Sequence, residues 1–434
     1  MRQIKKIFFI FCFPSLCASA QEMLTLNQAI EIALKNNHSV LIAKSQSNIA
    51  ANNTSPGNAG MLPQINLNAS GNTSVNNTQQ RFSTGVEIDK PNVKSTTIAY
   101  GPSLTWTLFD GMKMFITYDK LKEQQSMSEL GLKIEIENTI VKVITSYCDL
   151  IRQKQLIQAA RQANFIYEEK EKLAQERFKV GLASQLDVMQ AKLDVNMQNT
   201  QRIQLQTGLQ NSKSNLNQLL ARRADVDFDA TDSLILTYDA KYEDMINLIE
   251  KQNNALLFSQ KNIKIFDYSL RELKTQRSPI VGINLNYNFS RSQNQAGLIL
   301  LNQNKGFNAG FTATWNLFNG FELNRQIKNS TIQVLISKYE YDVNKMQVQT
   351  NLLTTFRNYE QAKTILQSEE ENVKLVQQTI KIALEAFRIG KISSLELKNV
   401  QKSFDDVQVR VINARYDAKI AEAQLMHMNG VLVK

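Results

Sequence analysis

Apolar and polar residues alternate along four segments of the chain, which is the pattern of β-strands that have one apolar and one polar face. From Ile283 to Phe289, every second residue is apolar and the residues between them are asparagines. From Phe307 to Leu317, the intervening residues are Asn, Gly and Thr. We therefore predict strands at about 64–75, 98–110, 280–290 and 306–318. The polar segments 76–97 and 291–305 are predicted to be loops that face solvent.

Two long segments follow the strand pairs and have apolar residues at steps of three and four, which is typical of amphipathic helices. They run from Met112 to Phe178 and from Phe321 to Phe387, and both lie in regions without proline. About 66 residues at a rise of 1.5 Å make a helix roughly 100 Å long, which needs neighbouring helices.

Each long helix is expected to end at a glycine, Gly181 or Gly390, and a serine follows three residues later. Glycine, a tight turn and a serine N-cap predict that the chain folds back as a helical hairpin. The return helices are predicted at about 184–221 and 393–428, and an irregular acidic stretch, 225–244, follows the first.

The two halves of the chain repeat each other. Residues 104–111 recur at 313–320 with an offset of 209, and the only two tryptophans, Trp106 and Trp315, are equivalent. The glycine turns keep this offset. Pro63, however, corresponds to Pro279 at an offset of 216, so a 7-residue difference falls between about 69 and 104.

This repeat divides the mature chain into two predicted units, 21–228 and 229–434. Each unit would contain a helix, two strands and a long helical hairpin. Their length differs only in the segment between the two strands.

The first 20 residues have the pattern of a secretory signal peptide, with basic residues, an apolar run and a small-residue cleavage site before Gln21. Acylation of Cys17 is an alternative, although the residues before it fit that processing poorly. Removal of Arg2, Lys5 and Lys6 with the signal leaves a formal net charge of +7 from +10. This mild charge is spread along the helices and does not indicate nucleic-acid binding. Cys148 remains as the only cysteine, so no intrachain disulfide is expected.

After the signal, no run of about 18 apolar residues is available for a transmembrane helix, so a membrane would have to be crossed by strands. Apolar residues that alternate with Asn, Thr, Ser and Gly fit a lipid face and a wet lumen. Trp106, Trp315, Phe109 and Phe318 are then candidates for a membrane-interface girdle. A buried core tryptophan in a soluble sandwich is the alternative.

Four strands cannot close a barrel, and an open sheet edge is not viable in lipid. Several chains must therefore share one barrel. Three chains of four strands would give twelve strands, with a matching tube of twelve helices.

The chain resembles the TolC family of outer-membrane efflux and secretion channels. The resemblance is carried by residues 24–30, the Leu62-Pro63-Gln64-Ile65 junction, both Trp-x-Leu-Phe-Asp/Asn-Gly junctions and the Val180-Gly181-Leu182 turn. It covers essentially the whole mature chain. It implies an α+β membrane protein, a homotrimer whose twelve-stranded β-barrel in outer-membrane lipid continues into a periplasmic helical barrel.

The resemblance also implies a periplasmic adaptor, or membrane fusion, protein and an inner-membrane RND or ABC transporter as partners. Such a duct would export drugs, small molecules or, in type I secretion, proteins. In the family the helical turn meets the adaptor, and the matching residues are Val180, Gly181 and Leu182 with Ile389, Gly390 and Lys391. A turn that needs glycine only for its backbone conformation is the alternative.

Acidic residues follow both turns at equivalent positions, Asp187 and Glu396. Threefold symmetry would make an inward carboxylate into a ring that favours cations, and the family carries two such positions after the second turn. Glu396 matches the first, whereas Asn399 stands at the second. Phe387 and Ile392 occupy the places of the family's tyrosine and arginine latch, so a latch here must differ. A carboxylate that only stabilises its helix N-terminus is the alternative for Glu396.

No cofactor, metal or catalytic site is expected. The only histidines, His38 and His427, are far apart in sequence, and no phosphate-binding or nucleophile motif is present. The prediction is a passive export duct rather than an enzyme. A periplasmic coiled-coil scaffold or adhesin is the alternative, and it would not explain the strands.

Overall fold

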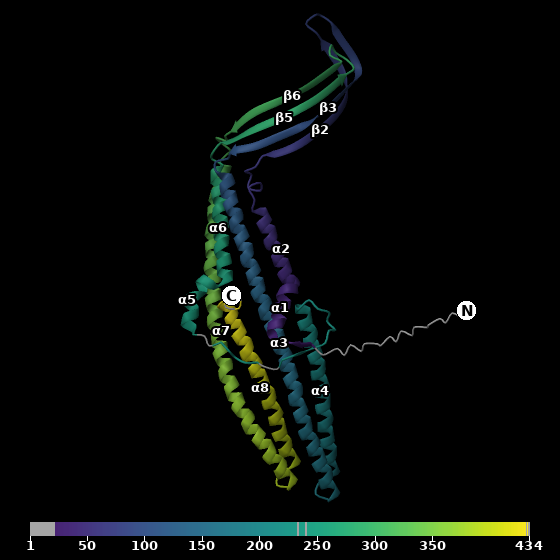
Figure 1. The fold of residues 1–434 in the computed structure, drawn as a ribbon, viewed down its shortest axis with the longest axis vertical. Coiled ribbons are helices and arrows are strands. Elements are labelled where there is room, and N and C mark those ends of the chain that lie inside the picture. Colours follow the sequence, from purple (N-terminus) through teal and green to yellow (C-terminus); the bar gives the residue numbers. More distant parts are fainter. Residues whose placement is uncertain (1–21, 232–233, 239–240, 431, 433–434) are drawn as a thin grey trace, which may run out of the picture. The chain divides into compact units, whose positions relative to one another are not determined.

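The computed structural model describes residues 22–231, 234–238, 241–430 and 432 (Figure 1). The predicted signal peptide, 1–20, and Cys17 lie outside the described residues. The elements follow in this order: β1 (Glu22–Leu24), α1 (Leu26–Asn36), α2 (His38–Asn53), β2 (Gln64–Arg81), β3 (Glu87–Phe109), α3 (Lys113–Lys179), α4 (Gln185–Leu219), β4 (Phe228–Ala230), α5 (Tyr242–Gln252), α6 (Asn254–Thr275), β5 (Ile280–Asn294), β6 (Leu301–Thr314), α7 (Glu322–Arg388) and α8 (Ser394–Met428).

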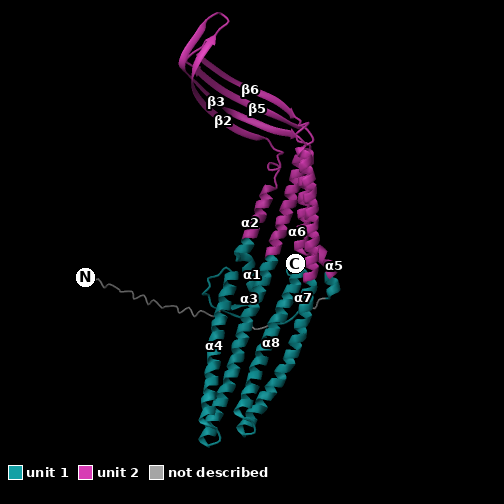
Figure 2. Ribbon diagram, turned by 180° about the vertical axis from the view of Figure 1, so that it is seen from behind, with its two compact units in different colours: residues 1–41, 136–245, 352–434 teal, residues 42–135, 246–351 magenta. Residues whose placement is uncertain are grey.

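The chain forms two compact units (Figure 2). The first takes its described residues from 1–41, 136–245 and 352–434, and the second contains 42–135 and 246–351. Helix α3 of the first half and helix α7 of the second half each contribute residues to both units. Each unit therefore contains residues from both halves of the chain. The units therefore group by packing and do not coincide with the two predicted repeats.

The second unit contains a four-stranded antiparallel sheet in the order β2-β3-β5-β6. Two hairpins form it, with Gln64 opposite Thr105 in the first and Ile280 opposite Thr314 in the second. The central pair joins the hairpins through β3 and β5, for example with Thr105 opposite Asn284. Among the strands of the described residues, β2 and β6 each have a neighbour on one side only.

The strands are longer than predicted at the hairpin turns. The segments predicted as loops, 76–97 and 291–305, are mostly paired strand, and only 82–86 and 295–300 connect the strands. Most of their side chains are polar, so no sustained period-two pattern marks a strand, yet backbone hydrogen bonds across a hairpin form regardless of side chain. The 7-residue difference between the halves therefore lies in the paired part of the longer first hairpin.

The last predicted strand, 306–318, was wrong at both ends, because β6 runs from Leu301 to Thr314. The first residue of β5, Ile280, lies opposite Thr314. Residues 315–318 thus have no β5 residue to pair with, and they are not strand.

The helical hairpins of the two halves have equal lengths. Helices α3 and α7 have 67 residues each, and α4 and α8 have 35 each. Ser184 and Ser393 cap the return helices, and each accepts a hydrogen bond from the backbone N–H three residues later. The return helices begin and end within two residues of the predicted limits.

The core of the first unit contains two short strands that the sequence pattern did not predict. β1 and β4 pair in parallel, and β4 lies inside the stretch 225–244 that we predicted to be irregular. Tyr147 of α3 donates a hydrogen bond from its hydroxyl to the Leu24 carbonyl, 2.8 Å away. The apolar residues around it are fully buried: Leu24, Val143, Leu150, Ile151, Leu216, Leu220 and Phe228. The core therefore holds β1 and β4 against α3 and α4.

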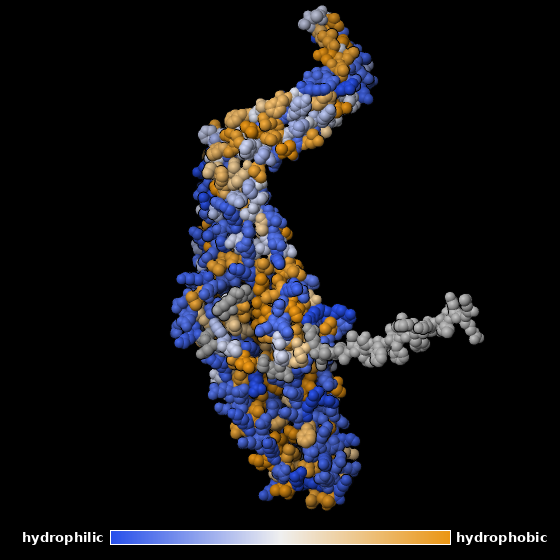
Figure 3. Space-filling view, viewed as in Figure 1, coloured by the Kyte–Doolittle hydropathy of each residue, from blue (hydrophilic) through white to orange (hydrophobic). Residues whose placement is uncertain are grey.

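Figure 3 shows apolar residues over the sheet, and on the helices it shows hydrophilic residues around a central apolar patch. Ile65 and Leu67 of β2 are 71% and 79% exposed, and Phe307 and Phe311 of β6 are 64% and 67% exposed. Within the described part of the chain, no helix is both long and apolar enough to span a membrane. An exposed apolar surface of this kind marks a site of protein or lipid contact.

Candidate functional site

The helical turns of the first unit expose the residues that the sequence predicted as tips. Val180 and Leu182 are each 69% exposed, and Ile389 is 65% exposed. Gly181 and Gly390 have φ of +76° and +77°, a conformation that other residues adopt only with strain. A side chain at Gly181 would meet no atom within 4 Å, so its backbone conformation alone requires glycine there.

Arg177, near the end of α3, joins the two turns within one chain. Its guanidinium donates a hydrogen bond from Nη1 to the Phe387 carbonyl at 3.0 Å and lies 4.8 Å from the centre of the Phe387 ring. A longer contact of 3.5 Å joins Nη2 to the Leu182 carbonyl. A charged hydrogen bond and a cation–π contact therefore connect the first turn to the second. Nothing in the sequence pattern indicated Arg177, because its position three residues before the turn carries no motif.

Phe387, which we predicted at the gate, is a core residue in this structure. It is 3% exposed and packs with Leu173 of α3, Ile380 of α7 and Leu397 and Phe404 of α8. Its ring helps to hold the two hairpins together, and its carbonyl is the group that reaches Arg177.

Asp187 and Glu396 both lie in the first turn of a return helix, where each accepts a hydrogen bond from the backbone N–H of its capping serine. These backbone hydrogen bonds, together with the serine hydroxyls, lower the pKa of both carboxyl groups. The carboxylates are therefore ionised and stabilise their helix ends. Asn399 is exposed one turn further along α8.

A buried ion cluster lies further along the same helices. Lys170 of α3 is 1% exposed, and its ammonium donates to Asp194 Oδ2 of α4 at 3.1 Å. Lys398 of α8 donates to the other oxygen at 2.9 Å. Burial opposes ionisation of Asp194, but the hydrogen bonds from Lys398 and Lys170 outweigh it and lower the pKa of this carboxyl. One carboxylate thus joins three helices, and nothing in the sequence pattern pointed to it.

A second carboxyl, that of the half-buried Asp405 of α8, lies in a different environment. Tyr167 of α3 donates a hydrogen bond to its Oδ2 at 2.9 Å, and Gln198 of α4 donates to the same oxygen at 3.2 Å. Its Oδ1 is buried without a hydrogen-bond partner, beside a pocket of about 260 Å³ among α3, α4 and α8. Burial raises the pKa of Asp405 to about 6.

The two tryptophans occupy equivalent places where a strand passes into a long helix. Trp106 donates from Nε1 to the Met61 carbonyl at 2.9 Å, and Trp315 donates to the Arg277 carbonyl at 3.0 Å. Each carbonyl lies three residues before the strand that starts the same hairpin. Each indole therefore fixes the helix-to-strand connector of its own hairpin.

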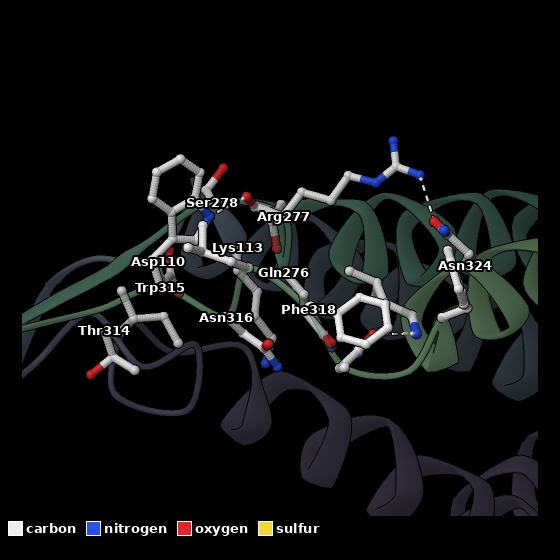
Figure 4. Close-up of a pocket in the computed structure, with 16 residues that line it drawn as sticks. Asp110, Lys113, Gln276, Arg277, Ser278, Thr314, Trp315, Asn316, Phe318 and Asn324 are labelled. Carbon is white, nitrogen blue, oxygen red and sulfur yellow. Dashed lines mark hydrogen bonds between the residues drawn. The ribbon is translucent and has the colours of Figure 1, made fainter.

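A pocket of about 590 Å³ lies beside Trp315 in the second unit. Figure 4 shows the polar and apolar side chains around it, with Arg277 reaching Asn324 of α7, at 3.3 Å. Phe318 and Phe321, which contact each other edge to face, are 72% and 68% exposed there. Phe109, the equivalent of Phe318 in the first half, is only 39% exposed, and Trp106 is 36% exposed against 59% for its equivalent Trp315. In the part of the chain that the structure describes, no group of His, Cys, Asp and Glu could hold a metal ion.

A family model described as outer membrane efflux protein matches residues 29–222 and 245–431 of the chain. A sequence relative, the outer membrane efflux protein BepC of Brucella suis biovar 1 (strain 1330), is 21% identical over 336 residues, which are 77% of this chain and 72% of BepC. A membrane protein of known structure from Pseudomonas aeruginosa has a TM-score of 0.79 at 15% identity, covering 94% of this chain and 92% of that one. The outer membrane protein VceC of Vibrio cholerae has a TM-score of 0.75 at 17% identity, covering 93% and 96%.

Proposed function

Because the chain belongs to the outer membrane efflux protein family, we propose that it forms the exit duct of a tripartite efflux pump or a type I secretion system. The protein lies in the outer membrane and extends into the periplasm. Its cargo would be drugs, small molecules or proteins, delivered from the periplasm or from an inner-membrane transporter.

The observation that carries this proposal is the four-stranded sheet with two free edges and exposed apolar side chains. A sheet edge in lipid must be paired, because unpaired backbone groups there cost several kcal/mol each. Three copies that join edge to edge would close a barrel of twelve strands, and their helical hairpins would form the tube below it. The two halves of each chain, 21–228 and 229–434, would then contribute equivalent hairpins to this homotrimer.

The helical turns are proposed as the contact for a periplasmic adaptor protein, which would link the duct to an RND or ABC transporter. This proposal is supported by the exposed apolar side chains of Val180, Leu182 and Ile389. Exposed apolar surface of this kind favours binding of a partner that buries it. Gly181, Gly390 and Lys391 would complete the contact. The difference between Leu182 and Lys391 would make the two turns of each chain unequal to the adaptor.

We further propose that the turns form the periplasmic gate. The Arg177 contact with the Phe387 carbonyl would hold the two hairpins of a chain together in the closed state. Asp187 and Glu396, both ionised, would place carboxylates near the opening, and Asn399 would leave the second acidic position of the family empty. Trp106, Trp315, Phe109 and Phe318 would lie near the membrane interface at the other end of the hairpins.

Fractionation and electrophoresis test the duct directly. We expect the mature protein in the outer-membrane fraction, as an oligomer that migrates as a trimer unless it is heated, and as a conducting channel in planar bilayers. A protein found only in the soluble periplasm would instead support a coiled-coil scaffold or adhesin. For the gate, Glu396→Gln is expected to lower cation selectivity, and unchanged selectivity would remove Glu396 from this role.

A further inference from the structure

We propose that β2 of a second copy pairs with β6 in one fixed register, with Thr314 opposite Asn68 of the second copy, and that the connector before that β2 covers Gly320. This rests on the proposed oligomer and goes beyond it, because it states which residues meet. The register follows from the internal repeat and from the pairing within one chain.

Apart from the 7 extra residues of the first hairpin, the hairpins of the two halves correspond residue by residue. In the first hairpin Gln64 lies opposite Thr105, and in the second Ile280 lies opposite Thr314. Gln64 and Ile280 differ by 216, and Thr105 and Thr314 differ by 209, which are the two offsets found in the sequence. In a closed sheet, each residue pair between β3 and β5 of one chain therefore predicts an equivalent pair between β6 and the β2 of a second copy.

The contact between β3 and β5 supplies the template. There, Thr105 lies opposite Asn284, and Trp106 lies opposite Ile283. We add 209 to each β3 residue number and subtract 216 from each β5 residue number. This places Thr314 opposite Asn68 of the second copy, and Trp315 opposite its Leu67.

The side chains agree with this register. In the parts of the edge strands that this register brings together, odd-numbered residues are apolar: Ile65, Leu67 and Ala69 on β2, and Phe307, Ala309, Phe311 and Ala313 on β6. Antiparallel partners point to the same face of a sheet, so the register must pair odd with odd residues. A slip by one residue would place these apolar side chains on the polar face.

Residues 315–318 show what is missing in a single chain. Their equivalents, 106–109, belong to a strand because β5 lies beside them. Residues 315–318 have no such neighbour and are not strand, and Leu317 and Phe318 are 79% and 72% exposed, against 46% and 39% for Leu108 and Phe109. A second copy's β2 would supply the missing neighbour and extend β6 through these residues.

The glycine after each Trp-containing segment gives an independent indication. A side chain on Gly111 would come within 2.7 Å of the Thr275 carbonyl oxygen and of Ser278 Cβ, so the connector before β5 packs tightly there. A side chain on Gly320 would meet nothing within 4 Å. Ala59 and Leu62 are the equivalents of Thr275 and Ser278, and these residues of the second copy would cover Gly320 beside the 590 Å³ pocket.

Cysteine cross-linking tests the register, because the mature chain has only Cys148, which is buried. In a Cys148→Ala background, the pair Asn68→Cys and Thr314→Cys is treated with a short bis-methanethiosulfonate reagent. Both side chains are on the polar face, where a water-soluble reagent can reach them. We expect covalent dimers and trimers. A second in-register pair, Ser70→Cys with Thr312→Cys, should give the same products.

The matched control is Asn72→Cys with Thr314→Cys, which lies on the same face but is displaced by four residues, about 13 Å along the strand. It should cross-link at least tenfold less. Equal or stronger cross-linking of this control would overturn the register. The heat-sensitive trimer is checked for every variant, and its presence would still support the duct in that case. The duct itself is tested on the unaltered protein, where absence of the trimer would contradict it, and Cys148→Ala is used as the background once it is shown to form the same trimer.

Hydrogen exchange on the unaltered protein tests the same inference without variants. In the assembled protein, the backbone amides of 315–318 and Gly320 should be protected to the same extent as those of 106–109 and Gly111. Rapid exchange of 315–318 in a stable trimer would show that no strand of a second copy pairs there.

Discussion

Replacing Arg177 by methionine is expected to loosen the contact between the two helical turns of each chain. Methionine keeps much of the apolar stem that packs against the Phe387 ring and removes the guanidinium. The lost groups are the 3.0 Å hydrogen bond to the Phe387 carbonyl and the cation–π contact at 4.8 Å.

The size of the effect follows from these contacts. A hydrogen bond from a charged donor contributes about 1.5–3 kcal/mol, and a partly exposed cation–π contact contributes about 0.5–1 kcal/mol. Arg177 is only half-buried, so we take the lower end, about 2 kcal/mol. Since 1.4 kcal/mol is a factor of ten, an equilibrium that separates the two turns would shift roughly 30-fold in each chain.

Bilayer recordings measure this shift as higher conductance or a larger open fraction of Arg177→Met channels. Hydrogen exchange at 387–391 should also become faster. Lys179→Met is the matched control, because it removes the same charge from an exposed position at the same helix end. If both variants conduct alike, the Arg177 contact does not restrain the turns and the gating proposal for it is refuted.

Three further predictions concern the helices and the junctions. Asp194→Asn should destabilise the fold by about 3–5 kcal/mol, because it removes the carboxylate charge that pairs with the buried ammonium of Lys170. Lys398→Met should cost under about 1 kcal/mol, because the Lys398 side chain is exposed. Thermal melting that finds equal losses for the two variants would contradict this difference. Asp405→Asn should stabilise the protein above about pH 6 and not below pH 4. The folded state raises the pKa of this carboxyl to about 6, so its ionisation costs stability as pH rises through that value. A difference in melting temperature between variant and unaltered protein that does not change between pH 4 and pH 8 would refute this prediction. Trp315→Phe should lower the heat-dissociation temperature of the oligomer, because it removes a hydrogen bond worth about 1 kcal/mol to the Arg277 carbonyl, and an unchanged temperature would mean that the indole N–H does not fix the connector.

The sequence was sufficient for features that local pattern determines. Alternation located the four strands, the glycine and serine positions located the turns and caps, and the repeat related Trp106 to Trp315. Contacts between helices were out of reach, because the position of Arg177 opposite Phe387, or of Lys170 opposite Asp194, depends on how two long helices are placed along each other. Every long amphipathic helix has many charged residues, and their spacing does not tell which one faces a partner.

The end of β6 shows a different relation between sequence and structure. Alternation continues through Leu317, so the sequence predicts strand up to 318, whereas strand ends at Thr314 in the single chain. A strand needs a neighbour for its backbone hydrogen bonds, and residues 315–318 have none from β5. The equivalent residues 106–109 do have one and are strand. On our proposal, the alternation therefore fits the strand of the assembled sheet, and the apolar side chains that a single chain leaves exposed at 315–318 mark the place that a second copy fills.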